Sequence, residues 1–120
     1  MPAATKDLII EQGATFRLQL RWKDKDDNPY DLTNYTARMQ IRRNYTSDHV
    51  IAEFTTENGR ITLGGVAGTI VIEMAATETA QLKFSEGVYD LEMVAQDGFV
   101  TRLLQGKVTL APEATRDVSP

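Results

Sequence analysis

Apolar and polar residues alternate along most of this 120-residue chain, and a period of two is typical of half-buried β-strands. In residues 15–23 (TFRLQLRWK), four apolar side chains share one face, and basic or amide side chains share the other. The same alternation recurs in residues 36–42, 69–74 and 88–95. A helix would scatter these apolar residues around its circumference, so the pattern predicts strands in all four segments.

Turn-forming residues separate the predicted strands. Asn58–Gly59 and Asp97–Gly98 are pairs that favour tight hairpins, because both positions tolerate a positive φ. Residues 50–57 (VIAEFTTE) alternate more weakly, and we expect a short strand there, near the edge of a sheet.

Two segments depart from simple alternation. Residues 77–83 favour one or two helical turns, with Thr77 as the N-cap. In residues 99–110 the apolar positions change phase at Leu103–Leu104. Either a β-bulge at that point or a strand buried on both faces would account for the change.

Many short strands with frequent turns predict an all-β protein, and we expect an immunoglobulin-like β-sandwich of about 7–9 antiparallel strands. A strand, a short helical turn and a strand beginning GVYDL follow the order found at the E–F corner of such a domain. Tyr89 would then stand at the start of strand F, with its hydroxyl bonded back to the corner. Trp22 fits the fold less well, because it falls on the second predicted strand and not on the third.

The sandwich is expected to span residues 7–111, with flexible ends at residues 1–6 and 112–120, which are small and polar. Leu32 and Tyr35 precede the strand at 36–42 and are expected to anchor its entry in the core.

Composition excludes several classes of protein. The chain carries 17 acidic and 13 basic residues, for a net charge of −4, whereas dedicated nucleic-acid binders are usually basic. The absence of cysteine excludes disulfide scaffolds and thiol nucleophiles. No apolar run reaches a transmembrane length and no export signal is evident, so we expect synthesis in the cytoplasm.

Candidate catalytic and metal-binding residues are few. His49 is the single histidine and lies in a polar segment without a recognisable nucleophile. Asp24, Asp26 and Asn28 match the first positions of a calcium loop, but Pro29 replaces the required glycine and Tyr35 the bidentate glutamate. We therefore expect an acidic turn there, no cofactor or small-molecule substrate, and no enzymatic activity.

Two basic rows are the remaining candidates for function. Arg17 and Arg21 lie on one predicted strand, and Arg38, Gln40 and Arg42 on another. If the two strands were neighbours, the rows would join into one positive stripe. The simplest interpretation is a solvated sheet face, and the alternative is a contact between subunits, since arginine is enriched at interfaces.

Four stretches resemble a family of small tailed-phage tail proteins: DLIIEQGATFRLQLRW, NPYDLTNYTARMQIR, TENGRITLGGVAGTIVIEMAATETAQL and GVYDLEMVAQDGFVTRLLQGKVTLAPEATR. Together they span roughly residues 7–116. The family includes tail-tip collar proteins, and the N-terminal domains of phage upper-baseplate proteins begin in a similar way. Where a glycine is common before the tyrosine of the DLT-YT segment, this chain has Asn34, which also tolerates a left-handed backbone.

The resemblance implies a non-enzymatic structural component of a phage tail, namely a collar or baseplate-proximal ring built from several copies. It also implies contacts with other tail proteins and a place in the virion, with no nucleic acid or membrane as partner. One alternative is a module that binds carbohydrate or a cell surface through Tyr30, Tyr35 and Tyr45. A weaker alternative is a tail assembly chaperone.

Overall fold

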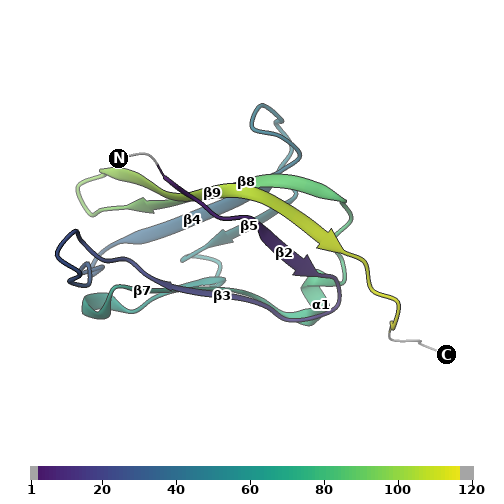
Figure 1. The fold of residues 1–120 in the computed structure, drawn as a ribbon, viewed down its shortest axis with the longest axis horizontal. Helices are drawn as coiled ribbons and strands as arrows, with labels where there is room; N and C mark the ends of the chain where they lie inside the picture. Colours follow the sequence, from purple (N-terminus) through teal and green to yellow (C-terminus); the bar gives the residue numbers. More distant parts are fainter. Residues whose placement is uncertain (1–2, 117–120) are drawn as a thin grey trace.

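The computed structural model describes residues 3–116, which form two β-sheets packed as the layers of a sandwich (Figure 1). Residues 1–2 and 117–120, the outer parts of the two expected flexible ends, lie outside the described residues. The elements in chain order are β1 (Ala4–Thr5), β2 (Leu8–Glu11), β3 (Phe16–Arg21), β4 (Thr36–Arg42), β5 (Ala52–Thr55), β6 (Ile61–Leu63), a 3₁₀ turn (Gly65–Ala67), β7 (Thr69–Met74), α1 (Ala76–Thr79), β8 (Glu86–Val94) and β9 (Val100–Ala111).

The strand order is that of an immunoglobulin-like β-sandwich. One sheet has the order β1-β9-β8-β4-β5, with β2 also paired to β9, and the other has the order β3-β7-β6. All pairings are antiparallel except those of β1 and β2 with β9, which are parallel. The all-β prediction is thus confirmed, while the expectation of antiparallel strands throughout is wrong at the N-terminal edge.

The alternation seen in the sequence sorts residues into core and surface as expected. Alternate residues of β4, β7 and β8 are buried between the two sheets. Leu32 is only 2% exposed and anchors the loop before β4, whereas Tyr35 is half-buried at the margin of the core. Trp22 also lies at this margin, immediately after β3.

The phase change in the last strand is a β-bulge. Leu91 of β8 pairs with Leu104, but the next residue, Glu92, pairs with Arg102. Leu103 is therefore the extra residue of β9, and the strand changes its facing there, as one of the two sequence interpretations predicts.

Two local predictions are wrong in detail. The helical turn α1 begins at Ala76 and ends at Thr79, earlier than residues 77–83, and its N-cap is Ala75 instead of Thr77. The Glu78 side chain reaches back to accept the Ala75 N–H, and the Glu78 N–H donates to the Ala75 carbonyl, so the helix start is closed without a capping side chain from Thr77. Asn58–Gly59 does not close a hairpin, because β5 and β6 belong to different sheets.

Tyr89 does not form the expected corner. Its hydroxyl donates a 2.6 Å hydrogen bond to the Lys6 carbonyl, on the N-terminal segment, and not to the connection between β7 and β8. Gly106 lies opposite Tyr89 on β9, and its missing side chain leaves room for Lys6 to approach. The bond ties Lys6 to the sandwich and β1 pairs with β9, so the domain begins before the expected boundary at residue 7.

We predict that Tyr89→Phe lowers the free energy of unfolding by about 1–2 kcal/mol, because the Lys6 carbonyl loses its donor. Burial raises the pKa of the Tyr89 hydroxyl to about 12, so the donor keeps its proton throughout the neutral range. Urea denaturation measures the change, with Tyr45→Phe as the matched control because Tyr45 is 57% exposed. Equal losses in the two variants would contradict a specific role for this bond.

Candidate interaction surfaces

The predicted row on β4 is held by bonds within the molecule. The Arg38 Nε lies 2.7 Å from a carboxylate oxygen of Glu92, and Gln40 donates to Glu53 at 2.9 Å. Arg42 donates to the carbonyls of Ser47 and Asp48, and to the Gln40 side chain. The row is thus a network on the outer face of the sheet and not a set of free positive charges.

The two basic rows do not form one stripe. β3 carries Arg17 and Arg21 in one sheet, whereas β4 carries Arg38 and Arg42 in the other. The outward residues of the two strands therefore lie on opposite faces of the sandwich. The sequence shows which side chains are exposed but not which layer each strand joins, and the hypothesis of a joint stripe is wrong for that reason.

Asp90 lies within the network on the outer face of β8. One carboxylate oxygen of Asp90 is 3.6 Å from the Arg102 Nε. Burial and the neighbouring charge of Glu92 raise the pKa of Asp90, whereas Arg102, Arg38 and Arg42 lower it. The raising effects are larger, so the pKa of Asp90 lies above its ordinary value. The charged form of Asp90 is therefore held less favourably in the folded protein than in water.

We predict that Asp90→Asn stabilises the protein at neutral pH. A raised folded pKa means that the folded state binds more protons than the unfolded state between the two pKa values, so the stability of the native protein falls as pH rises through that window. The advantage of the variant should be complete above the folded pKa and absent below the ordinary pKa of aspartate. Urea denaturation over a pH series tests this, with Asp26→Asn as an exposed control. A pH-independent difference would contradict it.

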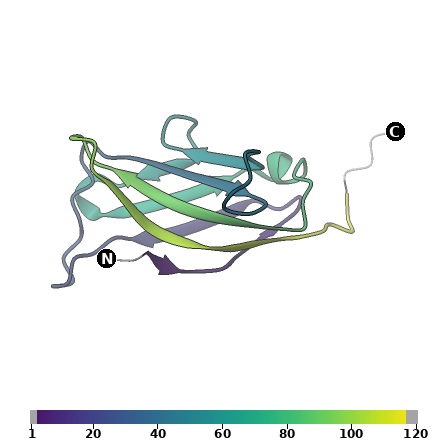
Figure 2. The ribbon, with the colours of Figure 1, turned by 90° about the horizontal axis from the view of Figure 1, so that it is seen from above.

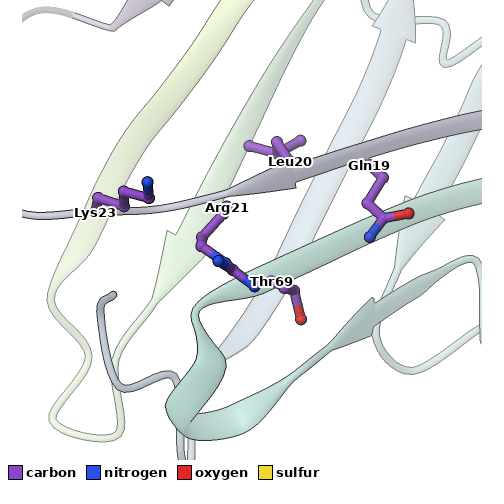
Figure 3. Close-up of a pocket in the computed structure, with 5 residues that line it drawn as sticks. All are labelled: Gln19, Leu20, Arg21, Lys23 and Thr69. Atoms are coloured by element: carbon purple, nitrogen blue, oxygen red, sulfur yellow. The ribbon is translucent and has the colours of Figure 1, made fainter. Parts of the chain in front are cut away.

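The free edge of β3 carries the other predicted residues. β3 pairs with β7 on one side, and no described strand pairs with its other side. Figure 3 shows a shallow hollow at this strand, with Gln19 and Arg21 on one side of the strand and Leu20 on the other. Arg17 has a loose ion pair with Glu73 at 3.6 Å, and no ion pair of Arg21 occurs among the described residues.

An aromatic groove was not predicted from the sequence. Trp22 stacks on Tyr30 with 4.1 Å between ring centroids, and Tyr35 meets Trp22 edge-on at 6.0 Å. Phe99, which is 69% exposed, lines the same groove of about 520 Å³. Lys23 and Arg102 add positive charge at its margin.

The tyrosines of the alternative carbohydrate site are only partly brought together. Tyr30 and Tyr35 lie in the aromatic groove, whereas Tyr45 borders a separate hollow beside Arg42 and Tyr89. The groove is also lined by Trp22 and Phe99, which come from two other segments of the chain. A sequence signal existed in the hairpin residue Phe99, because it is a large apolar residue directly after a turn.

The residues considered as candidates for catalysis or metal binding lie in an acidic turn and beside a surface hollow. Asp24 accepts hydrogen bonds from the backbone N–H groups of Asp26 and Asn28, as in the expected acidic turn. His49 borders a shallow hollow with Ser47. Within residues 3–116, no cluster of three or more His, Asp or Glu side chains is placed to hold a metal ion.

Comparisons with known proteins add little. No family model matches the chain, and no curated protein matches it. One similar solved structure is the extracellular domain of the voltage-gated sodium channel beta4 subunit, described as a parallel homodimer with a role in cell–cell adhesion. It is 11% identical, with a TM-score of 0.46, and the match covers 94% of this chain and 96% of that one.

The class of the protein follows from its own strand order: the chain is an immunoglobulin-like β-sandwich. No helix among the described residues has the length and apolar character needed to cross a membrane.

Proposed function

We propose that the chain is a non-enzymatic structural subunit of a phage tail, a collar or baseplate-proximal ring protein that assembles in several copies with other tail proteins. The resemblance of its strand and turn segments to tail-tip proteins motivates the proposal. The observation that supports it best is a cysteine-free sandwich whose edge strands β3, β5 and β6 have no partner on their outer sides among the described residues. Free edges are surfaces through which subunits can extend one another's sheets.

Purified particles of the phage or prophage that encodes the chain test this proposal. A ring protein must be present in the finished virion in a fixed stoichiometry, which quantitative mass spectrometry measures. An assembly chaperone would be absent from virions but necessary for tail formation. Absence of the protein from intact particles would therefore refute the collar role.

The predicted contact row is tested in the same particles. If Arg38 and Arg42 contact another subunit, reversing both charges to glutamate should block tail assembly. If assembly is unchanged, the row serves only the solvated face, where Glu92 and Ser47 already engage these arginines. Arg43→Glu is a neighbouring control on an exposed residue.

The aromatic groove favours a second candidate function, an adhesion module that binds carbohydrate. Sugars stack on exposed aromatic rings, and Tyr30 and Phe99 are both exposed beside the positive charges of Lys23 and Arg102. Glycan-array binding that is lost in Tyr30→Ala and Phe99→Ala, but retained in Tyr45→Ala, would support this candidate. No binding to any glycan would remove it.

A further inference from the structure

β2 and β3 both present unused backbone groups at one margin of the sandwich. In β2 the pairing to β9 is parallel, and the flanking bonds run from Lys6 N–H to the Gln105 carbonyl and from Gln12 N–H to the Ala111 carbonyl. Because alternate residues of such a strand bond to the same neighbour, the even-numbered residues face β9. The backbone groups of Asp7, Ile9 and Glu11 therefore face away from β9, and of these the Glu11 carbonyl already accepts the Ala14 N–H, at 3.1 Å, in the turn after β2.

The same reasoning fixes the outward groups of β3. Trp22 N–H donates to the Gly68 carbonyl at 2.8 Å, in register with the antiparallel pairing of β3 and β7. The even-numbered residues of β3 thus bond to β7, and the backbone groups of Arg17, Gln19 and Arg21 face the free side. Leu18 and Leu20 remain half-buried, because no described strand covers the core beyond β3.

The outward side chains of the two edges are complementary in charge and spacing. Ile9 and Glu11 of β2, and Asp7 directly before it, are exposed, as are Arg17, Gln19 and Arg21 of β3. One carboxylate oxygen of Asp7 also accepts the Lys107 N–H of β9, at 3.0 Å. In an antiparallel arrangement Glu11 faces Arg17, Ile9 faces Gln19 and Asp7 faces Arg21. Both members of each pair have their backbone groups on the free side of the strand, so the register that matches the charges also matches the hydrogen bonds, apart from the Glu11 carbonyl, which the Ala14 N–H already uses.

We propose that two copies of this chain form a two-fold dimer in which β2 of each copy pairs with β3 of the other. Within one chain this pairing does not occur, because β2 and β3 lie in different sheets. A second copy supplies the missing partner for both edges at once.

The geometry of the sandwich permits both pairings together. The chain turns back after β2, so β3 runs in the opposite direction (Figure 1), and both strands lie along the same margin when seen from above (Figure 2). The groove lined by Ala4 and Trp22 also places the N-terminal segment beside the end of β3. Rotation about a two-fold axis parallel to the strands leaves the strand directions unchanged. It brings the sheet that contains β2 in one copy beside the sheet that contains β3 in the other, and does so on both sides of the axis. Such an interface closes at two copies.

Charge also selects this partner over the simpler pairings of like edges. If two β3 strands paired about Gln19, Arg17 would face Arg21 on both sides, and if two β2 strands paired about Ile9, Asp7 would face Glu11. Both arrangements place like charges directly opposite each other, which destabilises a sheet. Of these three arrangements, only the cross-pairing of β2 with β3 places opposite charges together, and it sets the Gln19 side chain beside Ile9, which is 67% exposed in the single chain.

This dimer goes beyond the proposed tail function. A ring requires a head-to-tail contact, whereas a two-fold contact is self-complementary and closes on itself. The dimer would therefore describe the free protein, or a contact between two rings, and its test does not depend on any phage particle.

The full chain is examined by sedimentation velocity over concentrations up to the millimolar range. We expect a concentration-dependent dimer. Gln19→Pro should abolish it, because proline removes an outward N–H that β7 does not use. Gln19→Thr keeps that N–H and should still dimerise. Circular dichroism and urea denaturation establish that each variant is folded.

A charge exchange provides the second arm of the test. Glu11→Arg or Arg17→Glu alone should raise the dimer dissociation constant about tenfold, because each change affects two symmetric pairs. The double variant should recover most of the loss, whereas Glu11→Arg combined with Arg38→Glu should not. A protein that stays monomeric at every concentration, or a dimer that tolerates Gln19→Pro and shows no charge rescue, would overturn the proposal.

Discussion

Phe54→Ala is expected to lower the free energy of unfolding by about 3–5 kcal/mol. Phe54 is fully buried on β5, and its ring centroid lies 6.2 Å from that of Phe16 on the opposite sheet. Truncation removes a large apolar side chain from the space between the layers and leaves a cavity that the flanking strands cannot fill without moving. The guanidinium of Arg60 also loses the ring over which it lies, at 5.9 Å from the centroid.

Urea denaturation followed by circular dichroism measures this loss. Phe99→Ala is the matched control, because Phe99 is 69% exposed and its removal should change the stability by no more than about 0.5 kcal/mol. If both variants lost a comparable free energy of unfolding, the Phe99 side chain would have to be buried against another molecule in solution, as it would be if a ligand occupied the aromatic groove. A small loss in Phe54→Ala would contradict its position between the two sheets.

The facing of residues in the regularly alternating strands could be predicted from the sequence, because alternation is a local property. In a strand, neighbouring side chains point to opposite sides whatever the strand pairs with. The alternation in residues 36–42 and 69–74 predicted one buried face in each strand, and Met39 and Ile72 lie on those faces and are buried. The phase change at Leu103–Leu104 was also visible, but the sequence left a bulge and a strand buried on both faces as alternatives, and the pairing of β8 with β9 shows the bulge.

Sheet membership could not be predicted in the same way, because it depends on pairing between distant segments. Asn58–Gly59 has the composition of a hairpin turn but connects two layers. Arg17 and Arg38 have the same local setting, an arginine between apolar neighbours, yet they lie on opposite faces of the sandwich. No local pattern separates the two cases.

The aromatic groove was missed for a related reason. Trp22 follows β3, Tyr30 lies in the loop before β4, and Phe99 follows the turn after β8. Their side chains meet only because the fold brings these three segments to one end of the molecule. The alternation placed Trp22 on the apolar face of residues 15–23, and Trp22 does lie at the margin of the core. The alternation gave no indication of the Tyr30 and Tyr35 rings that pack against it.

The N-terminal pairing was also hidden, although Gly106 offered a signal. A glycine inside a strand often marks a place where another backbone approaches closely. A Cβ at Gly106 would lie 2.3 Å from the Lys6 carbonyl oxygen and 2.8 Å from its carbon, closer than any real contact. The segment at residues 1–6 was expected to be flexible because its composition is small and polar, but a glycine opposite it lets the Tyr89 hydroxyl and the β9 backbone hold Lys6.

Gly106→Val is therefore expected to lower the free energy of unfolding by about 3 kcal/mol. At an ordinary exposed strand position the same change would favour the strand, since valine has the higher β propensity. Here the added side chain displaces Lys6, which breaks its bond to Gln105 and removes the acceptor of Tyr89. The effect should exceed that of Tyr89→Phe, which removes the hydroxyl but leaves the backbone pairing of Lys6 in place.

Hydrogen exchange distinguishes this cause from a general loss of stability. In Gly106→Val, the Lys6 amide should lose its protection before the amides in the centre of β8 do, whereas Thr109→Val, an exposed change on the same strand, should leave both unchanged. If the valine variant instead keeps Lys6 protected and remains as stable as the native chain, the N-terminal segment does not lie across Gly106. The pairing of β2 with β9, which rests on residues 8–11 and the Gln12 N–H, would then have to hold the N-terminal edge without the contact at Lys6.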